Sequence, residues 1–183
     1  MGNRHWQILA GSVLALALTG TATAADHRVS EEDSTLAFSG KVDGEAFDGQ
    51  FHRFYGQIRF DADDLAKTHF AIDIETGSVD TDSSERDEAL ATPEWFNSAL
   101  FPAARFEAEG ARVDGDGYRS DGQLTIRGRP RPVSLHYALS EDGSRLRGSA
   151  RLNRIDWGLG GDDWADDEMV AHAVEVRVDV QLR

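Results

Sequence analysis

The stretch VAHAVEVRVDVQL, Val170–Leu182, decides the fold, because it alternates apolar and polar side chains along most of its length. Every second residue from Val174 to Val180 is a valine, and the residues between them are charged. Successive side chains of a strand point to opposite faces, so this pattern predicts a strand with one apolar and one solvated face. Similar runs recur upstream, and they predict an antiparallel sheet that is solvated on one side only.

Seven more strand patterns precede this one, separated by turns rich in glycine. They are Thr35–Val42, Gln50–Asp61, Phe70–Ile74, Phe106–Ala108, Leu124–Ile126, Val133–Leu139 and Leu146–Leu152. The inward parity switches between Phe51 and Phe54, which predicts a bulge near His52 and Arg53. Few helical patterns are available to cover the apolar side. The sheet must therefore fold onto itself, and the spacing of these eight strands is typical of an all-β barrel or sandwich.

One helical segment interrupts the strands between Asp82 and Pro102. Asp82 or Ser83 can cap its start, and the acidic residues that follow favour the positive end of a helix. Pro93 breaks the segment before the pair Trp95-Phe96. We expect this short helix to cap one end of the barrel, with the aromatic pair acting either as a plug or as a ligand contact.

The first 24 residues have the pattern of a signal peptide. Arg4 provides the positive start, Ile8–Leu18 the apolar run, and Ala22-Thr23-Ala24 the small residues of a cleavage site. We therefore expect one domain over residues 25–183, exported to the periplasm or secreted, without a membrane-spanning segment. The chain has no cysteine, so it cannot form a disulfide. Its net charge of −14 disfavours nucleic-acid partners.

Catalytic and metal-binding patterns are missing from the sequence. It contains no Gly-x-Ser-x-Gly, His-Glu-x-x-His or phosphate-binding Gly-Lys-Ser/Thr motif, so we expect neither enzyme activity nor a cofactor. The histidines of the strand regions lack the paired spacing of a metal site; these are His52, His69, His136 and His172. The acidic stretch Asp162–Glu168 lacks the order of an EF-hand loop, which favours a solvated loop over a calcium site.

An ordered series of motifs resembles the YceI family of exported lipid-binding proteins. It comprises Asp33–Phe38, Gly49–Asp61, Ile72–Ile74 with Ser78–Thr81, Arg86-Asp87 with Leu90, Trp95–Asn97, Phe101–Phe106, Gly122–Gly128 with Pro132-Val133, and Asn153–Leu159. The chain departs from the family pattern at Glu88, at Trp95 and in the acidic loop after Gly160.

The resemblance implies an all-β fold, an eight-stranded antiparallel, lipocalin-like β-barrel whose long apolar cavity holds a polyisoprenoid or another long amphiphile. It also implies a connection with a b-type cytochrome or another membrane redox partner. The implied ligands are an isoprenoid quinone, a prenyl phosphate or a fatty amphiphile. The resemblance establishes no catalysis, and a homodimer is left open.

Small residues on the inward parity, such as Gly122, Gly148 and Ala150, indicate either room for a ligand or relief of crowding in a solid core. A buried methylene contributes about 0.8 kcal/mol, and association costs roughly 4 to 15 kcal/mol, so only a long chain would bind well. The predicted cavity lining is Phe38, Phe51, Phe54, Phe60, Ile72, Ile74, Phe106, Leu124, Ile126, Val174, Val176 and Val178.

Arginines near the turns are candidates for binding the ligand's head group, because a guanidinium suits phosphate and carboxylate. The predicted head-group residues are Arg53, Arg127, Arg129 and Trp157, with Arg131 beside them. Each arginine can equally be a solvated turn residue. The alternative functions are a solid-cored stress or interaction protein that acts through its acidic outer surface, and an acid–base hydrolase with a carboxylate pair.

Overall fold

The computed structural model describes residues 25–29 and 31–183, so the predicted signal peptide, residues 1–24, lies outside the described residues. The strands form one antiparallel sheet in the order β1-β4-β5-β7-β9-β10-β11-β12-β2-β3-β6, with β8 paired to β9. They are β1 (Ala25–Val29), β2 (Thr35–Val42), β3 (Glu45–Phe51), β4 (Phe54–Phe60), β5 (His69–Glu75), β6 (Val79–Asp80), β7 (Ala103–Glu109), β8 (Arg112–Asp114), β9 (Gly117–Ile126), β10 (Arg129–Leu139), β11 (Arg145–Asn153) and β12 (Ala173–Gln181).

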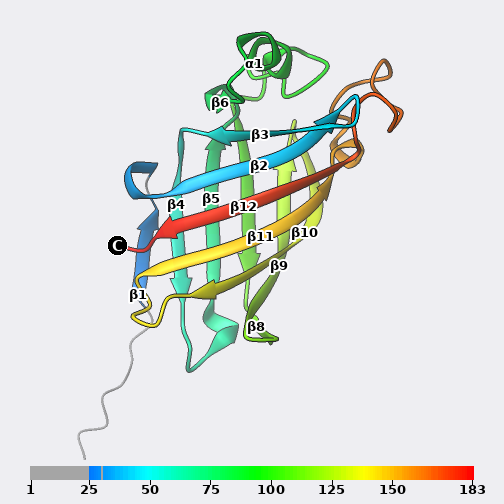
Figure 1. Cartoon of the computed structure of the whole chain (residues 1–183). Helices are drawn as coiled ribbons and strands as arrows, with labels where there is room; N and C mark the ends of the chain where they lie inside the picture. Colours follow the sequence, from blue (N-terminus) through cyan, green and yellow to red (C-terminus); the bar gives the residue numbers. More distant parts are fainter. Residues whose placement is uncertain (1–24, 30) are drawn as a thin grey trace, which may run out of the picture.

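The sheet curls round until β2, β12 and β11 cross in front of β4, β5 and β7 (Figure 1). The corner lies at His52 and Arg53, where β3 ends and β4 begins. β3 pairs with β2, whereas β4 pairs with β5, so one bent segment joins the two layers. The parity switch falls at this corner, where His52 and Arg53 lie between the two strands, and the backbone is held by the bond from Glu75 N to Arg53 O, 2.9 Å.

The predicted antiparallel barrel architecture is confirmed, but the strand count differs from eight. The expected strand over Gln50–Asp61 is divided between β3 and β4 by the corner. The short strands β1, β6 and β8 were not expected, because segments of two to five residues with few apolar side chains give no usable alternation.

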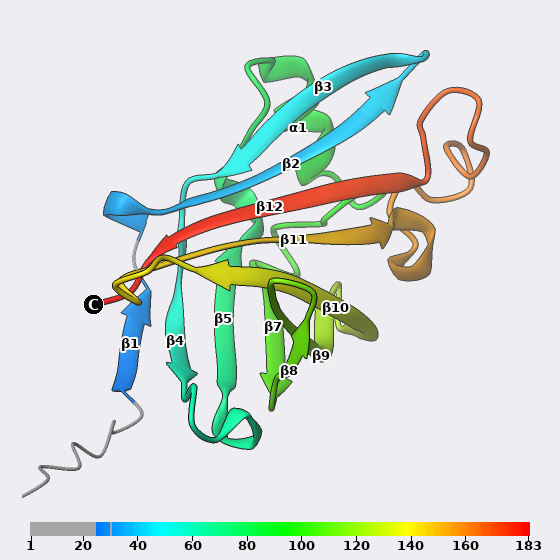
Figure 2. The ribbon, with the colours of Figure 1, turned by 60° about the horizontal axis from the view of Figure 1, so that its bottom comes forward.

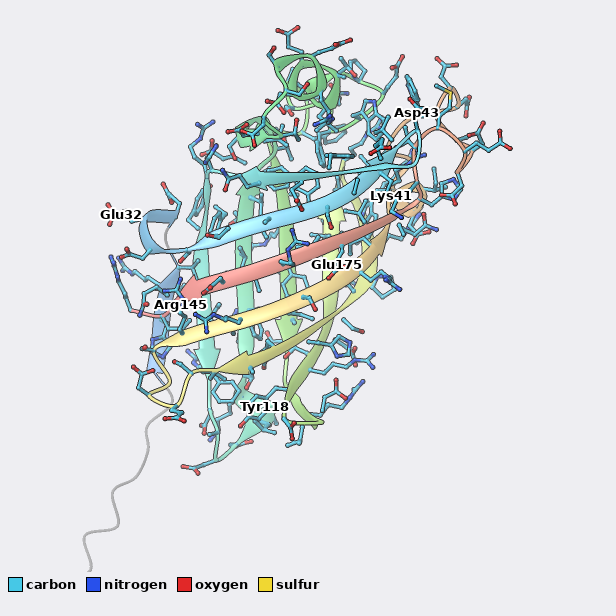
Figure 3. The ribbon with its side chains drawn as sticks, viewed as in Figure 1. Glu32, Lys41, Asp43, Tyr118, Arg145 and Glu175 are labelled. Atoms are coloured by element: carbon cyan, nitrogen blue, oxygen red, sulfur yellow. The ribbon has the colours of Figure 1, made fainter. Side chains whose placement is uncertain are left out.

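Strand register places the alternating residues of β12 as expected. Val176 lies opposite Ala150 of β11 and Phe38 of β2, so all three share the inner face. On the outer face, Arg177 donates a 2.7 Å hydrogen bond to the carboxylate of Asp48. Glu175 stands on the same outer face (Figure 3). The wall of the barrel is therefore apolar inside and charged outside.

Helix α1 (Ser84–Ala91) lies over one end of the barrel, opposite β8 (Figures 1 and 2). The side chain of Ser83 caps it by accepting a bond from Arg86 N, as predicted. The carboxylate of Asp87 accepts two hydrogen bonds from Thr81, 2.9 Å from its backbone N and 2.6 Å from its hydroxyl. Short 3-10 turns complete the chain: η1 (Glu31–Asp33), η2 (Leu65–Lys67), η3 (Thr76–Ser78) and η4 (Arg154–Trp157). None of the helices in the described ranges is long and apolar enough to cross a membrane.

Candidate ligand-binding cavity

The inner face of the barrel encloses a cavity of about 540 Å³. Its wall is made of inward residues from both crossing layers, including Ile58, Phe70, Leu135, Leu146 and Val180. These five side chains are buried, yet they leave space between the layers instead of meeting across it. The solid-cored alternative does not describe this barrel, because its interior is hollow.

Eleven of the twelve predicted lining residues face this cavity. They are Phe38, Phe51, Phe54, Ile72, Ile74, Phe106, Leu124, Ile126, Val174, Val176 and Val178. Phe60 is the exception, because it has the inward parity but lies beyond the end of the cavity, with its ring centroid 4.8 Å from that of Tyr118. Strand parity gives the face on which a side chain lies, but it does not give the depth at which the cavity ends.

Two of the small inward residues have a different role from the one their size suggested. A Cβ at Gly122 would lie 2.3 Å from the carbonyl oxygen of Glu107, and one at Gly148 would lie 2.6 Å from that of His136. These glycines allow close approach of the neighbouring strands, so they do not mark empty space. Ala150 does line the cavity.

Three segments that are distant in sequence surround the α1 end of the cavity, and we call them the rim. They are residues 83–96 with α1, the tip of the β2–β3 hairpin at 41–47, and the loop 160–171. The hairpin and the loop are joined by bonds from Asp43 N to Met169 O, 2.7 Å, and from Ala171 N to Lys41 O, 3.0 Å. The loop joins the α1 segment through Gly160 N and Glu94 O, 2.8 Å apart.

The rim is where the cavity reaches the surface. Glu85 and Ala89 of α1 are exposed and also line the cavity. The polar and charged lining residues gather on this side, in η3, the α1 segment, the end of β2 and residues 154–164. An amphiphile in this cavity would therefore find water and polar groups at the rim and apolar side chains everywhere deeper.

Arg154 is a buried cation in the cavity wall, with 3% of its surface exposed. Its guanidinium donates to the carbonyl oxygens of Ala171, Leu159, Trp164, Asp166 and Val170. Burial lowers the pKa of this guanidinium from its ordinary value, and the nearby acidic loop opposes the shift. The side chain thereby fixes the loop of the rim through backbone acceptors, without forming a direct ion pair within the described residues.

Arg86 is the second arginine that lines the cavity. Its guanidinium carbon lies 4.4 Å from the centroid of the Phe47 ring, which joins α1 to the β2–β3 hairpin. One nitrogen donates a 3.1 Å bond to the carbonyl oxygen of Thr81. Among the described residues no carboxylate pairs with it, so its remaining donors can meet an anionic or polar head group.

The predicted head-group arginines do not line the cavity. Arg53 forms an ion pair with Glu75 on the outer surface. Arg127, Arg129 and Arg131 instead bind the carbonyl oxygens of Gly158, Trp157 and Asp156, at 2.8 Å, 3.2 Å and 2.8 Å. These arginines lie outside the cavity lining, because Arg53 pairs on the outer surface and the β9–β10 turn lies against η4. Their role in binding a head group stays a prediction.

Trp157, predicted as a head-group residue, is almost fully buried and does line the cavity. Its indole N–H donates a 3.0 Å bond to the carbonyl oxygen of Leu124, so its polar atom is already used and it presents apolar surface. Sequence reasoning missed Arg86 and Arg154. Arg154 follows the inward Leu152 by two positions, and this parity was the one available signal.

The histidines and the acidic stretch form separate surface contacts. His52 pairs with Asp80, His69 with Glu109 and His136 with Asp114. His172 Nε2 donates a 2.7 Å hydrogen bond to the carbonyl oxygen of Ala165 in the acidic loop. Within the part of the chain that the structure describes, no group of three or more potential ligands could hold a metal ion.

Comparison of the sequence with known proteins shows the family. The model of the YceI-like domain matches residues 27–182. A UPF0312 protein of Yersinia pestis is 34% identical over 148 residues, covering 79% of this chain and 77% of the relative. A UPF0312 protein of an Enterobacter species is 32% identical over 154 residues, covering 82% and 79%.

Solved structures share the fold at lower identity. BcnA of Burkholderia cenocepacia superposes with a TM-score of 0.77 at 23% identity, covering 83% of this chain and 98% of that one. A polyisoprenoid binding domain of Saccharophagus degradans gives a TM-score of 0.60 at 14% identity, covering 88% and 99%. With a family match over most of its length and a hollow barrel of the same fold, the chain belongs to the YceI-like family.

Proposed function

We propose that this protein binds one long-chain amphiphile, a polyisoprenoid or a fatty chain, with the chain inside the barrel and the head group at the rim. The observation that carries the proposal is the cavity of about 540 Å³, which is apolar except at the rim. The polyisoprenoid-binding domain with the same fold supports the class of ligand. Membership of the YceI-like family favours binding over catalysis.

The physical reason for a long chain is the balance between burial and association. Each buried methylene contributes about 0.8 kcal/mol, and association costs roughly 4 to 15 kcal/mol. Short chains therefore bind weakly in an apolar cavity, whereas membrane-length chains overcome this cost. A quinone, a prenyl phosphate and a fatty acid all meet this requirement, and they differ in the head group that would lie at the rim.

The test is organic extraction of the purified protein followed by mass spectrometry. We expect about one hydrophobic molecule per chain from the wild type and none from Ile126→Asp, because a carboxylate in the apolar wall is costly to bury. Thr125→Asp is the matched control, since its side chain has the opposite, outward parity on the same strand. Circular dichroism establishes which variants fold, and a folded Ile126→Asp protein with full lipid content would overturn the proposal.

Three further predictions belong to this proposal. We expect residues 1–24 to direct export. The molecular mass of the protein recovered from the periplasmic fraction tests this. A b-type cytochrome or another membrane redox partner would receive or supply the ligand, which transfer of a bound quinone to membranes tests. Formation of a homodimer is measured by light scattering of the lipid-loaded protein.

A further inference from the structure

Three aromatic residues pack together beyond the deep end of the cavity, opposite α1. We call Phe60, Tyr118 and Tyr137 the floor. The ring centroids of Phe60 and Tyr118 are 4.8 Å apart, and those of Tyr118 and Tyr137 are 5.8 Å apart. Figure 3 shows Tyr118 at the end of the barrel away from α1. Tyr137 also packs edge-on against Phe70 of the cavity wall, at 5.3 Å.

The cavity ends at the floor on two facing strands. On β4, Ile58 lines the cavity, and Phe60, the next inward residue, does not. On β10, Leu135 lines it, and Tyr137, the next inward residue, does not. On both strands, the last inward residue that lines the cavity is aliphatic and the next inward residue is aromatic. The aromatic rings therefore form the boundary of the cavity.

Tyr137 is fixed in place below the cavity. Its hydroxyl lies 3.2 Å from Ser120 Oγ, which in turn donates a 2.9 Å bond to the carbonyl oxygen of Gly110. Tyr137 is 4% exposed and packs directly over Gly148. A ring held by neighbours on every side, in an interior of crystal-like density, does not move aside for a few additional carbons.

We propose that the floor sets the longest chain that the barrel can bury, with the chain entering tail first from the rim. This inference rests on the proposed function. The carbons of a chain that reaches as far as the floor are all transferred from water into the cavity. The additional carbons of a longer chain must remain at the rim. Affinity should therefore rise with each methylene by about fourfold, from the transfer of one CH₂, and stop rising at one chain length.

The test measures dissociation constants of the delipidated protein for n-alkanoates from octanoate to docosanoate, by displacement of a fluorescent fatty acid. For the wild type we expect a rise followed by a plateau. Tyr137→Leu opens the floor and should move the plateau to longer chains. Tyr137→Phe keeps the ring and should leave the plateau where it is.

A second variant tests the inference even if Tyr137→Leu does not fold. Leu146→Phe enlarges a buried side chain of the cavity wall near the floor and should move the plateau to shorter chains. Arg151→Phe adds a ring to the exposed face of the same strand and is the control. An unchanged plateau in every folded variant overturns the role of the floor, while absence of saturable binding at every length overturns the proposed function itself.

Discussion

The two ends of the cavity are built from different chemistry. The rim joins three segments that are far apart in sequence, through backbone hydrogen bonds and two arginines, Arg86 and Arg154. The floor consists of aromatic rings from β4, β9 and β10, with one buried hydroxyl pair, Tyr137 and Ser120. The rim therefore offers charge and access, whereas the floor offers only a rigid apolar surface. This difference gives an amphiphile one favourable direction in the barrel.

The largest expected effect is at the rim and concerns stability. Arg154→Met removes the donor of five carbonyl oxygens, and an unsatisfied buried group costs about 1 to 3 kcal/mol. Because water can reach part of the loop, we expect the free energy of unfolding to fall by about 3 kcal/mol in total. Urea denaturation followed by tryptophan fluorescence measures it. Arg151→Met removes an exposed arginine of β11, the strand that ends just before Arg154, as a control, and equal midpoints for the two variants would refute the role of Arg154 in holding the rim.

The next effect concerns the head group. Arg86→Met keeps an apolar contact with Phe47 but removes the charge, so hexadecanoate should bind about tenfold more weakly, within the range of a hydrogen bond to a charged group. Hexadecan-1-ol, which carries no charge, should keep most of its affinity. Arg53→Met is the control, because Arg53 pairs with Glu75 outside the cavity. If Arg53→Met gave the larger loss, the sequence-based choice of head-group residue would be right and the structural one wrong.

A smaller effect is expected at the floor. Tyr137→Phe removes the hydroxyl that meets Ser120 but keeps the ring, and Ser120 keeps its bond to Gly110 O. We expect a loss of about 1 kcal/mol in the free energy of unfolding, the net contribution of one hydrogen bond. Tyr55→Phe is the control, since Tyr55 is 51% exposed. Equal stabilities of the two variants would show that the hydroxyl pair does not brace the floor.

The smallest effect lies on the outer wall, away from both ends. Hydrogen bonds from Ser134 and Arg119 lower the pKa of Asp121 to about 2. A carboxyl whose pKa is lower in the folded state stabilises the fold above its unfolded pKa, and this contribution disappears as the pH falls. Asp121→Asn should therefore flatten the stability profile slightly between about pH 4 and pH 2. Asp116→Asn, in the β8–β9 turn, is the comparison, and identical profiles for the wild type and Asp121→Asn would contradict the assignment.

The walls could be predicted from the sequence, because alternation of side chains is a local property. The valines of β12 and the parity switch before Phe54 gave the inner face and the corner, and eleven of twelve lining residues followed. Helix α1 and its Ser83 cap could be predicted for the same local reason. The role of these lining residues in lipid binding stays a prediction.

The two ends could not be predicted in this way. Arg154 acts through carbonyl oxygens of a loop that follows in the chain, and backbone acceptors leave no mark in the sequence. Arg127 and Arg129 looked available because their acceptors lie far along the chain, at Gly158 and Trp157 where η4 ends. Phe60 had the correct parity, but the depth of the cavity depends on which rings meet across strands.

The most direct test of the hollow barrel as a chain-binding site is calorimetric titration of the delipidated protein with hexadecanoate at several temperatures. We predict saturation at one ligand per chain with a negative heat-capacity change, the robust sign that apolar surface leaves water. The matched run with hexanoate should give little binding. Weak, non-saturating heats for hexadecanoate, or binding without a negative heat-capacity change, would contradict the account.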